Sequence, residues 1–251
     1  MKRPYISLFL LLFFLISCAT TNSPIITKDV RARLDLAQAY ILKEQPRLAF
    51  IELKKIEDKA NRLPYFHFLK GLIYLQTREI NKAISSLTYA VKLDPQYGDA
   101  WNNLGLAYLA NKDEKKAISC FEKALSIETY KTPEYAAHNL ALIYVNKGKM
   151  DKAIFYEKKA LTLNWRYLPA YFSIINLYVK KGDIPSAIYW IKKGIEAYPD
   201  NVNLYYLLGE NYLRLGNTQD AKTAFFKVLE LDKSKKTKFA KLARDYLDIL
   251  E

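Results

Sequence analysis

Residue types that commonly carry chemistry are scarce in this sequence. Two cysteines and two histidines occur among its 251 residues, and His67 and His138 stand 71 positions apart. A metal centre needs three or four ligands close together, and the sequence shows no such cluster. It also lacks H-E-x-x-H, C-x-x-C, G-x-G-x-x-G and P-loop motifs. These residues predict a protein that is not an enzyme, with no catalytic residue, no metal site and no cofactor.

Cys18 is the cysteine with a distinctive context. The chain begins with Lys2 and Arg3, followed by an apolar run over residues 6–16, which is the plan of an export signal. The run is shorter than the roughly 20 apolar residues that span a bilayer. The stretch L-I-S-C over residues 15–18 resembles the bacterial lipobox, which implies that Cys18 is acylated and becomes the mature N-terminus. The alternative is an ordinary signal peptide in which Cys18 is an incidental small residue.

The context of Cys18 also predicts a location. Several acyl chains on one residue anchor a protein stably in a membrane. Ala19 follows, rather than the aspartate that marks inner-membrane retention in the enterobacterial pattern. We therefore expect an outer-membrane location, with the protein lipid-anchored and facing the periplasm.

The chain is basic, and its formal charge of +13 falls to +11 when Lys2 and Arg3 are lost with residues 1–17. Export excludes nucleic acid as a partner. The lysines are spread along the chain, so we expect them on solvated helix faces, with a mild attraction to phospholipid headgroups.

A regular spacing of tyrosine and alanine organises the rest of the chain. Tyrosine recurs in steps of 34, 34, 36, 34 and 34 residues, and an alanine stands nine residues after each of these tyrosines. The tyrosines are Tyr40, Tyr74, Tyr108, Tyr144, Tyr178 and Tyr212, and the alanines are Ala49, Ala83, Ala117, Ala153, Ala187 and Ala221. We expect these residues to pack repeated units together.

Each unit is predicted to contain two amphipathic helices. Trp101, Leu104 and Tyr108 recur at helical spacing, and Phe121 and Ala124 repeat that spacing after a break. Glycine marks the break in three later units, where it can adopt the left-handed conformation that ends a helix. These glycines are Gly148, Gly182 and Gly216, and the residues expected to cap the helix that follows the last two are Asp183 and Asn217.

These patterns resemble the tetratricopeptide repeat. Its W-x2-L-G-x2-Y pattern is met in full over residues 101–108, and its A-x3-F-x2-A pattern is met over residues 117–124. The departures from the pattern are Arg33, Lys70, Glu157 and Ile175. The resemblance implies an all-α fold: a right-handed superhelical solenoid of about six tetratricopeptide repeats with a C-terminal capping helix.

The predicted organisation has four parts. They are a signal peptide over 1–17, a lipidated N-terminus and linker over 18–29, six repeats over 30–233 and a capping helix over 234–251. The repeats are expected to begin near residues 30, 64, 98, 134, 168 and 202. Within them, His67 is expected to be a packed ring between helices, and Cys120 a small, partly buried thiol.

The resemblance also implies a concave groove that binds a protein partner. In the family, positions six and two residues before the repeated tyrosine, and one or two after it, generally face inward. Here these positions supply Leu34, Gln38, Ile41, Leu42, Phe68, Leu72, Leu75, Asn102, Leu106, His138, Leu142, Asn146, Phe172, Asn176, Tyr206 and Glu210. The N-terminal half of this groove is expected to be apolar, with polar residues from the third unit onward. The alternative is that the N-terminal linker or a neighbouring helix covers those leucines.

One irregularity indicates a narrower resemblance. The single 36-residue step comes from two extra residues in the stretch E-T-Y-K-T-P-E-Y, over 128–135. This insertion, the lipobox and the length together resemble the type IV pilus assembly lipoproteins of the PilF, PilW and Tgl family, the pilotins. The resemblance implies that the partner is an outer-membrane secretin subunit whose localisation and assembly the lipoprotein promotes. The alternative is a general periplasmic adaptor for cell-wall enzymes or envelope assembly machinery.

Overall fold

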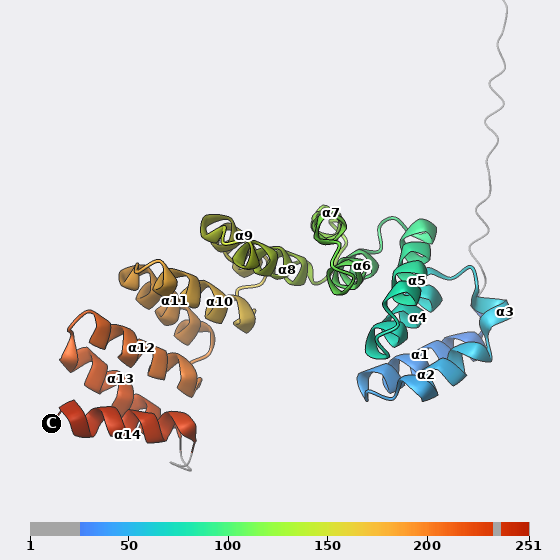
Figure 1. Cartoon of the computed structure of the whole chain (residues 1–251). Coiled ribbons are helices and arrows are strands. Elements are labelled where there is room, and N and C mark those ends of the chain that lie inside the picture. The colour runs from blue at the N-terminus through green and yellow to red at the C-terminus, as the bar shows by residue number, and fades with distance from the viewer. Residues whose placement is uncertain (1–25, 233–236, 251) are drawn as a thin grey trace, which may run out of the picture.

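The computed structural model describes residues 26–232 and 237–250, and every regular element in these ranges is an α-helix (Figure 1). The all-helical fold expected from the repeat pattern is therefore confirmed. Cys18 and the export signal lie outside the described residues. The helices are α1 (Lys28–Leu42), α2 (Pro46–Lys54), α3 (Glu57–Ala60), α4 (Pro64–Gln76), α5 (Ile80–Leu93), α6 (Gly98–Ala110), α7 (Glu114–Leu125), α8 (Pro133–Asn146), α9 (Met150–Leu163), α10 (Leu168–Lys180), α11 (Ile184–Ala197), α12 (Val202–Arg214), α13 (Thr218–Leu231) and α14 (Lys238–Leu250).

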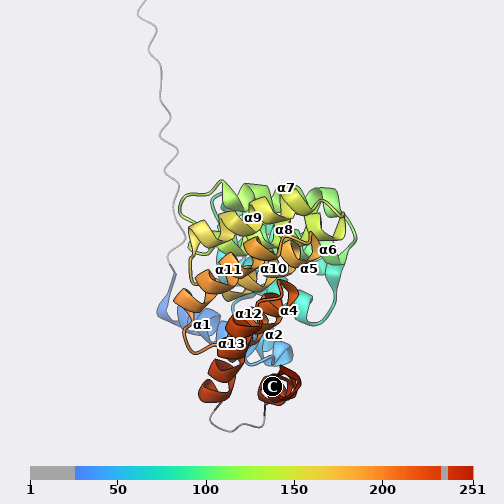
Figure 2. The same ribbon diagram turned by 90° about the vertical axis from the view of Figure 1, so that its left-hand side faces the viewer.

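Consecutive helices pair and stack into an arch. The six pairs are α1 with α2, α4 with α5, α6 with α7, α8 with α9, α10 with α11 and α12 with α13. In Figure 1, α6 and α8 lie on the inner side of the arch, beneath α7 and α9. Figure 2 views the same stack from its C-terminal end, with α14 packed against α13. No helix in the described ranges is both long and apolar enough to cross a membrane.

Small residues at repeated positions let the helices of a pair approach closely. All six repeated alanines are completely buried. Gly105 shows how close this approach is, because an added Cβ would lie 2.6 Å from the ring of Phe121 on the paired helix. Gly71 and Gly209 are in the same situation against Leu87 and Phe225. The repeat therefore encodes close helix packing through residue size.

The repeated tyrosines are half-buried, and most of them lie beneath a lysine. Lys116 Nζ lies 5.3 Å from the centroid of the Tyr108 ring. An ammonium group over an aromatic face is attracted by the ring quadrupole. The other pairs are Lys82 with Tyr74, Lys152 with Tyr144, Lys158 with Tyr178 and Lys192 with Tyr212. Part of the lysine excess therefore stabilises the repeat packing.

The turns between paired helices share one conformation. Gly148, Gly182 and Gly216 have φ of 67°, 75° and 73°, as expected for helix ends in the left-handed region. The earlier turns place Glu44, Arg78 and Lys112 in the same region, with φ of 55°, 60° and 61°. The expected N-caps also form, since the side chains of Asp183 and Asn217 accept hydrogen bonds from Ser186 N and Asp220 N.

The two-residue insertion forms a packed loop between α7 and α8. Its Tyr130 is buried, and an added Cβ on Gly98 would lie 2.4 Å from the Tyr130 ring carbon Cγ. Gly98 begins α6, so the loop packs back on the start of the pair that it follows, and Tyr130 also shares a core cluster with Leu140 of α8. Burial raises the pKa of Tyr130 above its ordinary value. The insertion therefore fixes the junction between these repeats through a specific contact.

Candidate functional site: the concave groove

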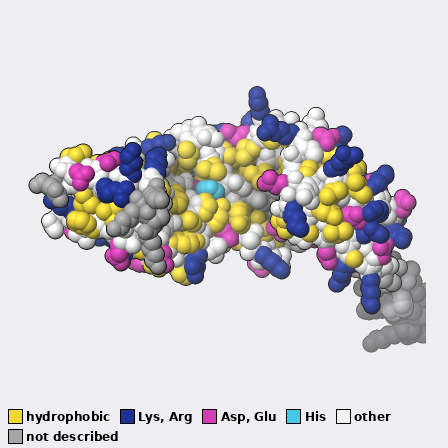
Figure 3. Space-filling view, turned by 90° about the horizontal axis from the view of Figure 1, so that it is seen from below, with side chains coloured by type: hydrophobic (Ala, Val, Ile, Leu, Met, Phe, Trp, Pro, Cys, Tyr) yellow, Lys and Arg dark blue, Asp and Glu magenta, His cyan; other side chains and the backbone are white. Residues whose placement is uncertain are grey.

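The inner surface of the arch is the candidate binding site. Figure 3 looks into the arch from below and shows hydrophobic side chains gathered along its middle, with many lysines and arginines near the margins. The rows of residues that reach this surface differ in part from those expected from the sequence.

Four residues expected to line the groove are buried instead, and one of them is Tyr206, which is 7% exposed. Leu34 and Ile41 are only 3% and 7% exposed and belong to the core around α1, α2 and α4. Asn102 is 7% exposed, and its Oδ1 accepts a hydrogen bond of 3.0 Å from Asn139 Nδ2. The assignment of these four as groove surface was wrong. Tyr206 belongs to the core cluster of the last repeat, and Asn102 lies where α6 contacts α8. Ile41 is closed in by α4, whose Gln76 Nε2 donates to its carbonyl oxygen.

The rows two residues before and two residues after the tyrosine provide the accessible surface. Leu42 and Leu142 are 77% and 42% exposed. Gln38, Asn146 and Asn176 are also exposed. The half-buried expected residues are Phe68, Leu72, Leu75, Leu106, His138, Phe172 and Glu210. Leu72, Leu106 and Leu142 occupy the same position in three successive repeats. The apolar surface thus continues into the fourth repeat, beyond the half of the groove expected from the sequence.

Two aromatic clusters lie 70 residues apart along the chain, at equivalent positions two repeats apart. The first contains Tyr65, Phe68 and Tyr97, with ring centroids 6.2 Å and 5.0 Å apart for the successive pairs. The second contains Tyr135, Tyr167 and His138, with the centroids of Tyr135 and His138 at 5.1 Å and 5.4 Å from Tyr167. We call them the first and second aromatic clusters. They give the groove two places that fit apolar side chains of a partner.

The histidine of the second cluster has a buried hydrogen-bond partner on the neighbouring helix. His138 Nδ1 lies 3.0 Å from both carboxylate oxygens of Glu157, a residue of α9 that is completely buried. The two equal distances join the imidazole on α8 and the carboxyl group on α9 in one hydrogen-bonded pair. Glu157 stands where the repeat usually has an aromatic residue. The structure explains this departure, because the carboxylate orients His138.

The surroundings of His138 are polar beneath the aromatic rings. Buried Glu134 accepts a 2.8 Å hydrogen bond from Asn164 Nδ2. Burial raises the pKa of Tyr167 to about 12, so its hydroxyl is a neutral hydrogen-bonding group at physiological pH. Tyr135 is 46% exposed and presents its ring to solvent. The second cluster can therefore combine apolar contact with hydrogen bonding, whereas Phe68 at the equivalent place makes the first cluster apolar.

The remaining histidine and cysteine have structural roles. His67 Nε2 lies 2.8 Å from the Asn61 carbonyl oxygen, and the ring packs edge-on against Phe66 and Tyr89. Burial is the main cause that lowers the pKa of His67. Cys120 is buried and its pKa is raised to about 12 by burial, so the thiolate that reacts as a nucleophile is scarce at neutral pH. No group of three possible metal ligands occurs among the described residues.

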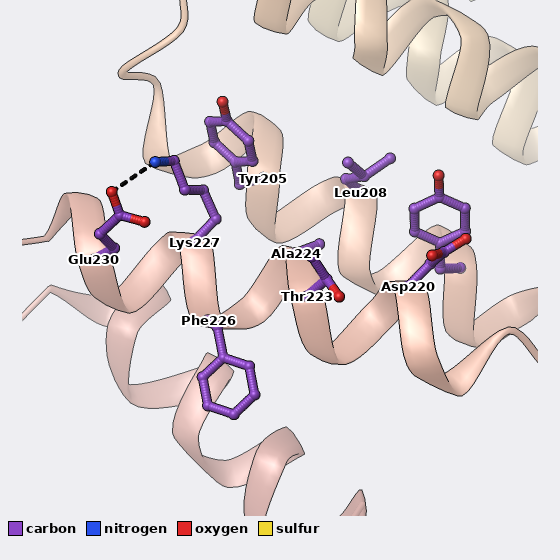
Figure 4. Close-up of a pocket in the computed structure, with 9 residues that line it drawn as sticks. Tyr205, Leu208, Asp220, Thr223, Ala224, Phe226, Lys227 and Glu230 are labelled. Carbon is purple, nitrogen blue, oxygen red and sulfur yellow. Dashed lines mark hydrogen bonds and ion pairs between the residues drawn. The ribbon is translucent and has the colours of Figure 1, made fainter.

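A separate hollow of about 500 Å³ lies between α12 and α13 (Figure 4). Tyr205 and Leu208 reach it from α12, and Lys227 and Glu230 on α13 form an ion pair of 2.7 Å at its margin. Its lining is mostly apolar, with charged groups at the margin. The hollow therefore lies within one helix pair, and the charged side chains Asp220, Lys227 and Glu230 in its lining already have partners.

The fold and groove define an all-helical repeat scaffold with a surface for protein binding. Models of the tetratricopeptide repeat match residues 71–112, 98–128, 135–164 and 190–223. An uncharacterized protein of Haemophilus influenzae is 30% identical over 121 residues, covering 48% of this chain and 68% of the relative. The chain belongs to the tetratricopeptide repeat proteins.

Other similarities extend over different shares of each protein. The photosystem I assembly protein Ycf3 of Prochlorococcus marinus is 28% identical over 96 residues, and the match spans 54% of its length. The crystal structure of PilW, a type IV pilus biogenesis factor, matches with a TM-score of 0.67 and 20% identity, over 87% of this chain and 99% of PilW. PilF of Pseudomonas aeruginosa matches with a TM-score of 0.67 and 16% identity, over 86% and 96%. YrrB, described as having an unusual peptide-binding site, matches with a TM-score of 0.55 and 19% identity, over 77% and 97%.

Proposed function

We propose that this protein is a lipoprotein, acylated at Cys18, that faces the periplasm from the outer membrane and binds a protein segment in its concave groove. The accessible apolar row formed by Leu72, Leu106 and Leu142 supports the binding role. Contiguous apolar surface on a protein commonly marks an interaction site. The lipobox-like sequence supports the anchor, and the absence of a metal-ligand group in the described ranges gives no support to an enzyme.

We further propose that the partner is an outer-membrane secretin subunit and that the protein acts as a pilotin in type IV pilus biogenesis. The observation that carries this proposal is the fold match over nearly the whole length of PilW and PilF. The insertion containing Tyr130, which packs on Gly98, supports the same assignment. Capturing a secretin segment in the groove would keep its apolar residues from water until assembly.

The anchor and the groove would act together. About ten residues separate Cys18 from the start of α1 at Lys28. A chain of that length spans at most roughly 35 Å when fully extended. The groove would therefore stay close to the bilayer, where tethering raises the effective concentration of captured partners.

The test replaces two exposed groove leucines with aspartate. A double variant that carries both Leu42→Asp and Leu142→Asp should keep its circular dichroism spectrum and its membrane fractionation, because both side chains are exposed. They should strongly reduce secretin multimers in the outer membrane and piliation, because a charge in an apolar contact is costly to desolvate. Leu215→Asp is the matched control, since Leu215 is 49% exposed in the turn after α12.

Normal piliation in the doubly substituted strain would contradict the groove assignment. A pull-down from native membranes tests the identity of the partner separately. Recovery of cell-wall enzymes without a secretin would replace the pilotin role with the adaptor role. Replacing Cys18 with alanine should release the protein from the membrane if the anchor is correct.

A further inference from the structure

The outer faces of α9 and α11 carry exposed aromatic residues at equivalent positions. Phe155 is 61% exposed and Tyr189, one repeat later, is 54% exposed. Leu163 lies on the exposed side of α9 and is 43% exposed. The same repeat position in α5 and α7 holds Ser85 and Ser119. The position holds Ile51 in α2, which is 42% exposed, and Thr223 in α13. An exposed aromatic residue at this position is therefore particular to the fourth and fifth repeats.

Lysines flank these aromatic residues in both helices. Lys158 and Lys159 follow Phe155 by three and four residues, and Lys192 follows Tyr189 by three. These lysines are exposed, and they lie on the same side of their helices as the aromatic residues because three and four residues make about one turn. We call Phe155, Leu163, Tyr189, Lys158, Lys159 and Lys192 the outer aromatic surface.

The acidic side chains on these outer faces are already paired. Asp151 at the start of α9 forms an ion pair of 2.6 Å with Lys181 Nζ, and Glu196 on α11 forms one of 2.7 Å with Lys193 Nζ. Lys158 and Lys192 lie over tyrosine rings, which leaves their charge uncompensated. The outer aromatic surface is thus net positive as well as apolar.

We propose that the outer aromatic surface rests on an anionic phospholipid bilayer. Lysine is depleted from protein–protein interfaces, whereas this surface alternates lysine with aromatic residues. At a bilayer, aromatic rings sit at headgroup level while lysine stems lie along apolar surface and place their charges in the headgroup layer. Each lysine near an anionic membrane surface contributes attraction that decays within a Debye length. The composition favours a lipid surface over an acidic protein.

This orientation separates two tasks on opposite sides of the arch. In Figure 1, α9 lies on the outer side of the arch while α8 lies beneath it. With the outer side on the bilayer, the groove with Leu106 and Leu142 opens away from the lipid. The inference depends on neither the secretin partner nor the groove assignment.

Tryptophan reporters test the proposal in the full chain, purified from membranes and reconstituted in vesicles. Phe155→Trp and Tyr189→Trp place a fluorophore in the surface, and Ser85→Trp places one at the same position of α5 as the matched control. Vesicles contain phosphatidylethanolamine and phosphatidylglycerol with brominated acyl chains, which quench tryptophans that touch the bilayer. We expect the added fluorescence of the first two reporters to be quenched and that of the control to persist.

Charge variants and salt complete the test. Lys159→Glu with Lys192→Glu should abolish the quenching, whereas Lys115→Glu with Lys123→Glu on α7 should retain it. Salt at about 1 M, where the Debye length is about 3 Å, should also abolish it. Equal quenching of all three reporters, or none in vesicles that carry the protein, would overturn the proposal. The Cys18→Ala variant tests the anchor separately. If this variant leaves the vesicles while the acylated protein is still quenched, the anchor assignment and the membrane-facing surface are both supported.

Discussion

At the scale of single residues, the buried carboxylate of Glu157 depends on one histidine. Both of its oxygens lie 3.0 Å from His138 Nδ1. We predict that His138→Ala destabilises the fold by about 3 kcal/mol, because it leaves the buried carboxyl group of Glu157 without its hydrogen-bond partner. Urea unfolding monitored by circular dichroism measures this loss.

A second substitution separates the charge from the packing. Glu157→Leu in the His138→Ala background should recover most of the lost free energy of unfolding, since an apolar residue needs no partner. If the double variant were as unstable as the single one, the loss would come from the cavity left by the imidazole rather than from the stranded carboxylate.

The turn residues give a second prediction at this scale. Gly182 has φ of 75° and an added Cβ would meet no atom within 4 Å, so Gly182→Ala changes backbone strain without creating a clash. We predict a loss of about 1 kcal/mol and a Tm lower by about 2–4 °C in calorimetry. Lys112→Gly, at φ of 61°, should shift Tm in the opposite direction by a smaller amount, because glycine also loses more chain entropy on folding. A fall in Tm for Lys112→Gly would contradict this account.

The same residues show how far the sequence was informative at this scale. Gly148, Gly182 and Gly216 predicted left-handed turns because glycine favours that conformation. Arg78 and Lys112 gave no such signal, since the close packing of the repeat imposes the turn on residues that do not favour it. Glu157 was visible as a departure from the repeat, but its contact with His138 joins two helices and could not be derived from local pattern.

At the scale of helices, the short α3 explains another departure from the repeat. Lys70 on α4 stands where leucine is usual, and its Nζ lies 2.9 Å from Glu57 Oε1 on α3. Lys54 contacts the second oxygen of Glu57 at 2.6 Å. Hydrogen bonds from Lys54, which has the larger effect, and from Lys70 lower the pKa of Glu57 from about 4.5 to about 2. α3 was not predicted, because four residues carry too little periodicity.

This lowered pKa predicts a pH dependence. Glu57 binds fewer protons when folded than when unfolded, so its contribution is complete above about pH 4.5 and is lost as pH falls towards about 2. Lys70→Met should reduce that loss by returning the pKa of Glu57 towards its ordinary value. Urea unfolding of the unsubstituted protein and of Lys70→Met at pH 5 and pH 3 compares how much free energy of unfolding each loses between the two pH values. An unchanged pH dependence in Lys70→Met would show that Lys70 does not stabilise the Glu57 carboxylate in solution.

At the scale of the whole molecule, repeats contact mainly their neighbours. The helix contacts join elements close in sequence, such as α1 with α4 and α12 with α14. The sequence could therefore predict the solenoid, because each unit recurs and stacks on the next. It predicted the groove rows less well, because the burial of Leu34 and Asn102 comes from contacts with neighbouring helices.

Because repeats stack mainly on their neighbours, we predict that the same core substitution loosens different helices when it is made in the middle or at the end of the arch. Phe121 on α7 and Phe225 on α13 occupy the same repeat position, and both are completely buried. Each change to alanine should cost about 3–5 kcal/mol locally. Hydrogen exchange should show that Phe225→Ala loosens α12, α13 and α14 while α4 to α9 keep their protection, because the Tyr246 ring on α14 stacks on Phe225 with centroids 4.9 Å apart. Phe121→Ala should instead loosen the central pairs and uncouple the two halves of the arch, giving two unfolding transitions. Equal loss of protection in every repeat after either change would show that the arch unfolds as one cooperative unit.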